Sequence, residues 1–113
     1  MPVMTDYNRS VAANATVDNV LAGKLDEFLR IDSVVTLHSV AQAVGVRVSL
    51  IIGGEVAIDD QELVARAGAT SVIIPDDFVV ASAGFNGDRM ILRLRNTTAG
   101  AIIVQTRLET SPA

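Results

Sequence analysis

The residues of this sequence best suited to specific charged contacts are arginines on apolar-rich runs near its end. Arg89, Arg93 and Arg95 fall on one side of the first run, because side chains alternate along a strand, and Arg107 lies on the second run, with Arg47 on an earlier one. Guanidinium groups bind carboxylates in a bidentate manner and can also contact phosphates. We therefore expect a contact with a partner protein. The alternative is a solvated face paired with Glu109 across a hairpin, worth roughly a few tenths of a kcal/mol per pair.

Nucleic acid is a poor candidate for the partner of these arginines. The chain has a net charge of −4, whereas nucleic-acid-binding domains concentrate positive charge. Aromatic residues that could stack on bases are limited to one tyrosine and three phenylalanines. We expect no binding to nucleic acid.

Other residues that could carry chemistry do not form a recognisable motif. The acidic pairs Asp59-Asp60 and Asp76-Asp77 lack the ligand spacing of a calcium loop, and turn or capping roles explain both. His38 is the only histidine and there is no cysteine, so a catalytic triad, a thiolate metal site or a histidine metal cluster has too few members. His38 lies within an apolar run, which favours a structural or interface role. We predict no enzyme activity and no catalytic, metal or cofactor site.

Several apolar runs read as strands. Residues 34–40 are rich in β-branched residues, and residues 46–52 alternate well, with Val46, Val48, Leu50 and Ile52 on one side. Gly53-Gly54 predicts a two-residue hairpin turn before a return strand over residues 55–58.

The last third of the chain contains the strongest strand pattern. Residues 88–95 and 101–110 flank a polar segment that ends in Gly100, which predicts a β-hairpin. On the inward side we expect Met90, Leu92, Leu94, Ile102, Val104, Thr106 and Leu108.

Four other segments are less certain in type. Residues 25–31 favour a strand or extended chain over a helix, and residues 59–68 fit either a short helix or two short strands broken at Asp59-Asp60. Short strands are expected at residues 71–74 and 79–81, separated by a turn over 75–78. Asn86-Gly87 predicts a tight turn with positive φ.

Together these elements indicate an all-β fold of about seven or eight short antiparallel strands, a β-sandwich or a barrel. At 113 residues the chain makes one domain, which we place at residues 16–113. Residues 1–15 are small and polar without periodicity, and they predict an extended N-terminal arm, either disordered or ordered on a neighbouring subunit.

The composition suggests that part of the surface is covered by another chain. Half of the residues are hydrophobic and only 19% are charged, below the usual quarter. No stretch approaches the roughly 20 apolar residues that a membrane helix needs. The N-terminal residues lack the basic start and apolar run of a signal peptide, so we expect synthesis in a cytoplasm without standard export.

Three stretches together resemble a known class of proteins: residues 7–17, Pro75-Asp76-Asp77-Phe78, and residues 88–98. The chain is similar to small, single-domain, jelly-roll-like β-sandwich proteins of bacteriophage virions, of the type that decorates or cements a capsid. The resemblance implies a non-enzymatic structural role in the virion, contact with a major capsid protein, and self-association, with a trimer favoured. Interface residues expected on this basis and from the arginine row are Tyr7, Arg9, Arg89, Arg93, Arg95 and Arg107.

Two other functions fit a small β-sandwich. A ligand- or carbohydrate-binding module is the alternative, although such modules usually present exposed aromatic residues and this chain has no tryptophan. A cupin-type enzyme needs at least two metal-binding histidines, and only His38 exists.

Overall fold

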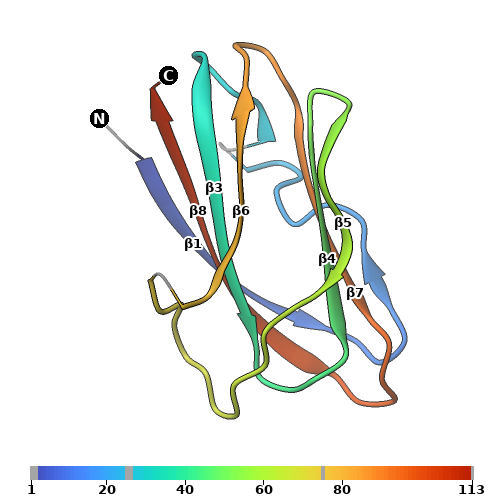
Figure 1. Ribbon diagram of the computed structural model, residues 1–113. Helices are drawn as coiled ribbons and strands as arrows, with labels where there is room; N and C mark the ends of the chain where they lie inside the picture. Colours follow the sequence, from blue (N-terminus) through green and yellow to red (C-terminus); the bar gives the residue numbers. More distant parts are fainter. Residues whose placement is uncertain (1–2, 25–26, 75, 113) are drawn as a thin grey trace.

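The computed structural model describes residues 3–24, 27–74 and 76–112, and they form two antiparallel β-sheets packed face to face (Figure 1). Eight strands are present in these residues. Among the described residues, only Glu27 has a helical (3-10) conformation. The strands are β1 (Val3–Val11), β2 (Thr16–Val17), β3 (Ser33–Ala41), β4 (Val46–Ile52), β5 (Glu55–Glu62), β6 (Phe78–Gly84), β7 (Met90–Asn96) and β8 (Ile102–Pro112). The all-β prediction and the expected strand number are confirmed.

The order of the strands identifies the sandwich as a jelly roll. Sheet A runs β1-β8-β3-β6 and sheet B runs β2-β7-β4-β5. The pairs β4–β5, β3–β6, β2–β7 and β1–β8 are therefore nested around one turn, as in a single long hairpin. This hairpin is rolled so that its pairs lie alternately in the two sheets, which is the eight-strand jelly-roll arrangement.

The turn at the centre of the nested pairs is Gly53-Gly54, as predicted. It joins β4 to β5, with Ile52 opposite Glu55. Its φ angles are 59° and 91°, and two positive values are what the favoured two-residue hairpin turn requires. The Gly53 N–H also donates to the Arg89 carbonyl at 2.9 Å, which ties the turn to the entry of β7.

The β-hairpin predicted for the last third of the chain is wrong in its pairing. Both strands exist, but β7 lies in sheet B and β8 in sheet A, so the segment between them crosses the sandwich. Buried Asn96 holds this crossing: its side-chain amide donates to the carbonyls of Val11 at 3.1 Å and Gly100 at 2.8 Å. Its side-chain oxygen accepts from the Thr98 N–H at 2.9 Å.

The predicted inward faces are confirmed even where the pairing is not. All seven inward residues named for β7 and β8 are buried, and so are the four named for β4. All of them except Thr106 join one hydrophobic core between the sheets, with Val35 and Leu37 of β3 and Leu21 and Leu29 of the connection after β2. The Thr106 hydroxyl shares a hydrogen bond with the Ser39 hydroxyl.

Residues 59–68 contain neither a helix nor a strand break at the acidic pair. β5 continues through Asp59 and Asp60 to Glu62, and a bulge accommodates the extra residue. Between the pairs Leu50–Ile58 and Val48–Gln61, two aspartates lie opposite one residue of β4. Asp60 takes a φ of 48°, a left-handed conformation that aspartate tolerates better than most residues.

The N-terminal arm expected over residues 1–15 is also corrected. Residues Val3–Val11 are strand β1, hydrogen-bonded along its whole length to β8 as an edge of sheet A. Its polar composition hid a strand whose inward side has only a few apolar positions, among them Val11 and the partly buried Tyr7. β1 is thus part of the sandwich.

The strand predicted at residues 71–74 is absent, because these residues are irregular. Residues 27–31, predicted as a strand or extended chain, contain an isolated bridge between Phe28 and Arg89 but no strand; positions 25, 26 and 75 lie outside the described residues. Residues of the chain between β5 and β6 are instead hydrogen-bonded to sheet A, since the Arg66 N–H donates to the Ala41 carbonyl and the Ser39 N–H donates to the Asp77 carbonyl. The strand at 79–81 and the turn at Asn86-Gly87 are confirmed, with φ of 90° at Gly87.

The two glycines of the central turn should respond differently to substitution. A Cβ on Gly53 would lie 2.5 Å from the Asp88 carboxyl carbon, whereas a Cβ on Gly54 meets nothing within 4 Å. Both replacements carry the cost of positive φ, about 1–2 kcal/mol. Gly53→Ala must also displace Asp88, which accepts a hydrogen bond from the Phe85 N–H, so we expect a total of about 3 kcal/mol.

Denaturant unfolding of both alanine variants measures this difference. In the Gly53→Ala background, removing the carboxylate with Asp88→Ala should cost much less than it does in the wild type. Equal losses of stability for Gly53→Ala and Gly54→Ala would contradict the proposed clash.

Candidate functional site

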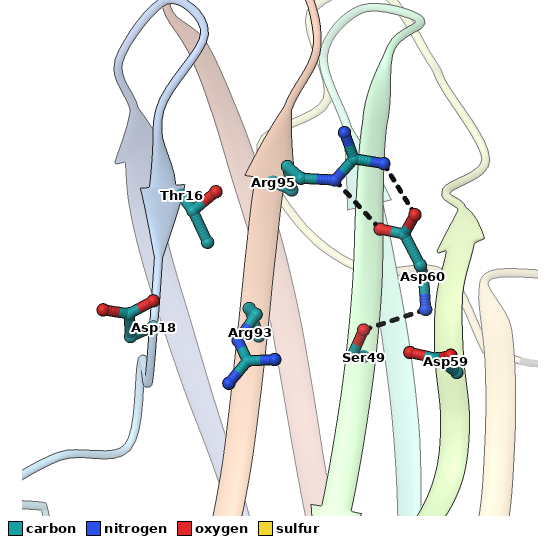
Figure 2. Close-up of a pocket in the computed structure, with 7 residues that line it drawn as sticks. All are labelled: Thr16, Asp18, Ser49, Asp59, Asp60, Arg93 and Arg95. Atoms are coloured by element: carbon teal, nitrogen blue, oxygen red, sulfur yellow. Dashed lines mark hydrogen bonds and ion pairs between the residues drawn. The ribbon is translucent and has the colours of Figure 1, made fainter.

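A polar depression of about 510 Å³ lies on the outer face of sheet B. Figure 2 shows its side chains on four neighbouring segments, from β2 across β7 and β4 to β5. It is lined by Thr16, Asp18, Ser49, Asp59, Asp60, Arg93 and Arg95. Strand alternation explains the set on β7 and β4, because Met90, Leu92 and Leu94 point inward and leave Arg93 and Arg95 outside.

Asp60 binds two arginines at the rim of this depression. Arg95 donates from Nε at 3.1 Å and from a terminal nitrogen at 2.6 Å, one bond to each carboxylate oxygen. Arg47 donates from its Nε to a carboxylate oxygen at 3.2 Å and to the Asp60 carbonyl at 2.8 Å. Two of the predicted cations, Arg47 and Arg95, thereby share one internal carboxylate.

The bulge in β5 makes this arrangement possible. The Ser49 hydroxyl accepts a hydrogen bond from the Asp60 N–H at 2.8 Å, which occupies a backbone donor that the bulge leaves without a ladder partner. The hydrogen bonds from Arg95 are the main cause of a lowered pKa at Asp60, below the usual 3.8. Asp60 is therefore an ionised anchor at neutral pH and not a proton donor.

Arg93 differs from its neighbours on β7. It is half-buried, and its Nε is enclosed without a hydrogen-bond partner. Within the described part of the chain, no carboxylate lies within 4 Å of its side-chain nitrogens. Figure 2 shows it between Asp18 on one side and Ser49 and Asp59 on the other. The guanidinium of Arg93 therefore lies in the depression with N–H donors that can bind a carboxylate of another molecule.

The remaining predicted interface residues are distributed over both sheets. Arg89 pairs with Glu27 at 2.9 Å near one end of the sandwich, and Arg107 pairs with Asp6 of β1 at 2.7 Å. Tyr7 and Arg9 both lie on β1, at the edge of sheet A. Glu109, expected to face the arginine row across a hairpin, is in sheet A and therefore away from Arg89, Arg93 and Arg95. The structure does not bring the six predicted residues into one site.

Two residues of the depression were singled out from the sequence only as a turn or capping pair, and three were missed. The acidic pair at 59–60 was visible, but its proximity to Arg47 and Arg95 depends on the register of β4, β5 and β7. Thr16, Asp18 and Ser49 carried no motif; the polar outward positions of strands next to β7 would have been the signal.

His38 and Asp77 of the second acidic pair are buried and contact other residues of the fold. His38 is 5% exposed and meets the Phe78 ring edge-on, with centroids 5.7 Å apart. Asp77 is buried and accepts hydrogen bonds from Arg66 at 3.1 Å and from the Ile73 N–H at 2.8 Å, which fixes the segment before β6.

The described residues contain no group of three or more histidine, cysteine, aspartate or glutamate side chains placed to hold a metal ion. In the same residues, no helix has the length and apolar character needed to cross a membrane.

Comparisons with known proteins found no match of this chain to a family model, to a curated protein or to a solved structure.

Asp60→Asn is expected to lower the stability of the protein at neutral pH. The pKa of Asp60 is depressed in the folded state, so its ionised form stabilises the fold at pH values above the unfolded value near 3.8. This contribution is lost as the pH falls through the depressed pKa. The difference in melting temperature between wild type and Asp60→Asn should therefore be largest near pH 7 and vanish in acid.

Asp59→Asn is the matched control, because Asp59 is exposed and forms no ion pair within the described residues. Its melting temperature should follow that of the wild type from neutral to acidic pH. A pH-independent difference for Asp60→Asn, or the same loss for both variants, would contradict an ion-pair role for Asp60.

Proposed function

We propose that the protein is a non-enzymatic structural component of a bacteriophage virion, a capsid decoration, cement or minor capsid protein that stabilises the shell through subunit contacts. The observation that carries this proposal is the nested pairing of all eight strands around Gly53-Gly54. Eight-strand jelly rolls recur in viral capsid domains, lectin domains and cupins, so the fold supports the assignment by analogy. The protein would be made in the host cytoplasm and become part of the virion.

The side chains favour the capsid role over the other two classes that use this fold. A cupin site gathers several histidines, whereas the one histidine of this sequence is buried against Phe78. Lectin-type sites present aromatic platforms over a polar groove. Here the depression contains no aromatic residue, and the Asp60 carboxylate in it is already bound by two arginines. A carbohydrate-binding module remains the alternative function.

The end of the sandwich near Arg89 supports a contact with another protein. Phe28, Ile31 and Phe85 are between 52% and 65% exposed there. They lie on two segments that are hydrogen-bonded to each other, through the Gly87 N–H to the Leu29 carbonyl and the Leu29 N–H to the Asp88 carbonyl. Exposed apolar side chains gathered in this way are typical of interaction sites.

We assign the capsid contact to the face around Arg93. Its guanidinium lacks an internal carboxylate, and capture of an acidic side chain from the major capsid protein would supply one. Arg9 is the other predicted interface arginine without an ion pair in the described residues, and it lies on the opposite sheet.

Particles purified on a density gradient from cells that carry this gene and produce phage should contain the chain in a fixed ratio to the shell protein. Purified protein added to particles lacking it should rebind, and Arg93→Gln should weaken rebinding by about tenfold, the loss of one charge-assisted contact. Arg30→Gln, at an exposed arginine outside the depression, is the matched control.

Absence of the chain from purified particles, together with no rebinding, would refute the proposed function. If Arg30→Gln reduces rebinding and Arg93→Gln does not, the contact lies instead at the end of the sandwich next to Phe28 and Ile31. A positive screen against immobilised glycans without particle binding would support the alternative function.

A further inference from the structure

β1 is the longest uninterrupted free edge among the described strands. It pairs with β8 over nine residues without a register shift, and its sequence contains neither proline nor glycine. The other edges are interrupted: β2 has two residues, β5 is shifted twice, and β6 slips between Leu37 and His38 of β3. Proteins usually protect edge strands with such irregularities, and β1 lacks them.

The backbone groups that face outward from β1 can be identified. The Ala41 N–H donates to Val64 and the Ala41 carbonyl accepts from Arg66, so these groups point away from β8. In an antiparallel pair, two opposite residues direct their backbone groups either towards each other or both away from each other. Val104 is opposite Ala41, so its N–H and carbonyl point away from β3 and towards Arg9 of β1.

The same alternation gives the direction of the other backbone N–H and carbonyl groups of β1. Thr5, Tyr7, Arg9 and Val11 bond to β8, while Met4, Asp6, Asn8 and Ser10 direct their N–H and carbonyl groups to the free edge. Within the described residues, no backbone hydrogen bond is made to these outward groups by another segment.

A second copy of β1 fits this edge, and the charges limit the register. For two copies related by a twofold axis perpendicular to the sheet, an axis through Asp6 or Arg9 would place like charges directly opposite each other, which is unfavourable. An axis through Asn8 places Asn8 opposite itself and Asp6 opposite Ser10. It also places Tyr7 opposite Arg9, twice by symmetry, in the close pairs without backbone hydrogen bonds.

We propose that two copies of this chain pair through β1, antiparallel and centred on Asn8, to make one continuous sheet of eight strands. A cation–π contact between Arg9 of each copy and Tyr7 of the other stabilises this pairing. Asp6 does not oppose the pairing, because Arg107 on β8 already neutralises it through two hydrogen bonds of 2.7 and 3.0 Å.

This contact goes beyond the proposed function and does not depend on a capsid. It also differs from the trimer that the resemblance implied, because a twofold contact closes at two chains. A threefold ring would require β1 of one copy to pair with a different edge of the next, for which β6, the other edge of sheet A, is the candidate.

Light scattering after size exclusion, with the full chain, tests the pairing. The wild type should have twice the mass of one chain. Asn8→Pro should raise the dissociation constant of the dimer by at least roughly tenfold. The monomer should stay folded, because the Asn8 N–H faces outward and proline is tolerated at such positions. Ala83→Pro is the matched control, since by the same alternation its N–H points away from β3 on the edge of β6. It should leave the dimer intact.

Charge exchange at position 8 tests the register. Asn8→Lys and Asn8→Asp should each be monomeric at concentrations where the wild type is a dimer, and an equimolar mixture of the two should form a heterodimer. Dimerisation of Asn8→Lys alone would place residue 8 opposite Asp6 and overturn the register. A wild type with the mass of one chain at its highest soluble concentration, or a trimer broken by Ala83→Pro, would overturn the pairing itself. Capsid rebinding is measured separately, so the two proposals can fail independently.

Discussion

The Gly53-Gly54 turn is the constraint on which the other pairings depend. Two consecutive positive φ values reverse the chain between β4 and β5, and every further pair, β3–β6, β2–β7 and β1–β8, is nested outside that reversal. A slip of one residue at the turn would turn Val46, Val48, Leu50 and Ile52 outward, because strand side chains alternate with a period of two. The Gly53 N–H, bonded to Arg89, also links the turn to the start of the strand next to β4.

The sequence predicts which side of a strand is buried much better than it predicts the neighbour of that strand. Alternation placed Leu92 and Val104 in the core correctly, since burial of one face requires only that the face be apolar. It could not show that β7 and β8 occupy different sheets. That outcome depends on Asn96, whose hydrogen bonds to Val11 and Gly100 satisfy backbone groups where the chain crosses the sandwich. β1 was missed for the converse reason, because an edge strand with few core positions shows little apolar periodicity.

The candidate site was predictable only in part for a related reason. The arginines of β7 were found because they share one strand and one face. The carboxylate partner of Arg95 is Asp60, which is 35 residues away in the sequence and reaches the guanidinium because a bulge places two aspartates opposite Ser49. No spacing rule reports a contact that depends on two strand registers and one bulge together. Two arginines of the row, Arg89 and Arg95, are thus ion-paired inside the chain, whereas the Nε of Arg93 has no hydrogen-bond partner.

Internal neutralisation also bears on how this chain can associate. Edge strands are commonly kept apart by charges that repel a second copy, and β1 carries Asp6 and Arg9. Asp6 is bound by Arg107 across the β1–β8 pair, so it presents little net charge to an approaching edge. Arg9 is opposite an aromatic ring in the twofold register centred on Asn8, which leaves outward backbone groups paired and avoids like charges. The scarcity of charged residues then has a physical role, because a nine-residue edge with more charge could not meet its own copy.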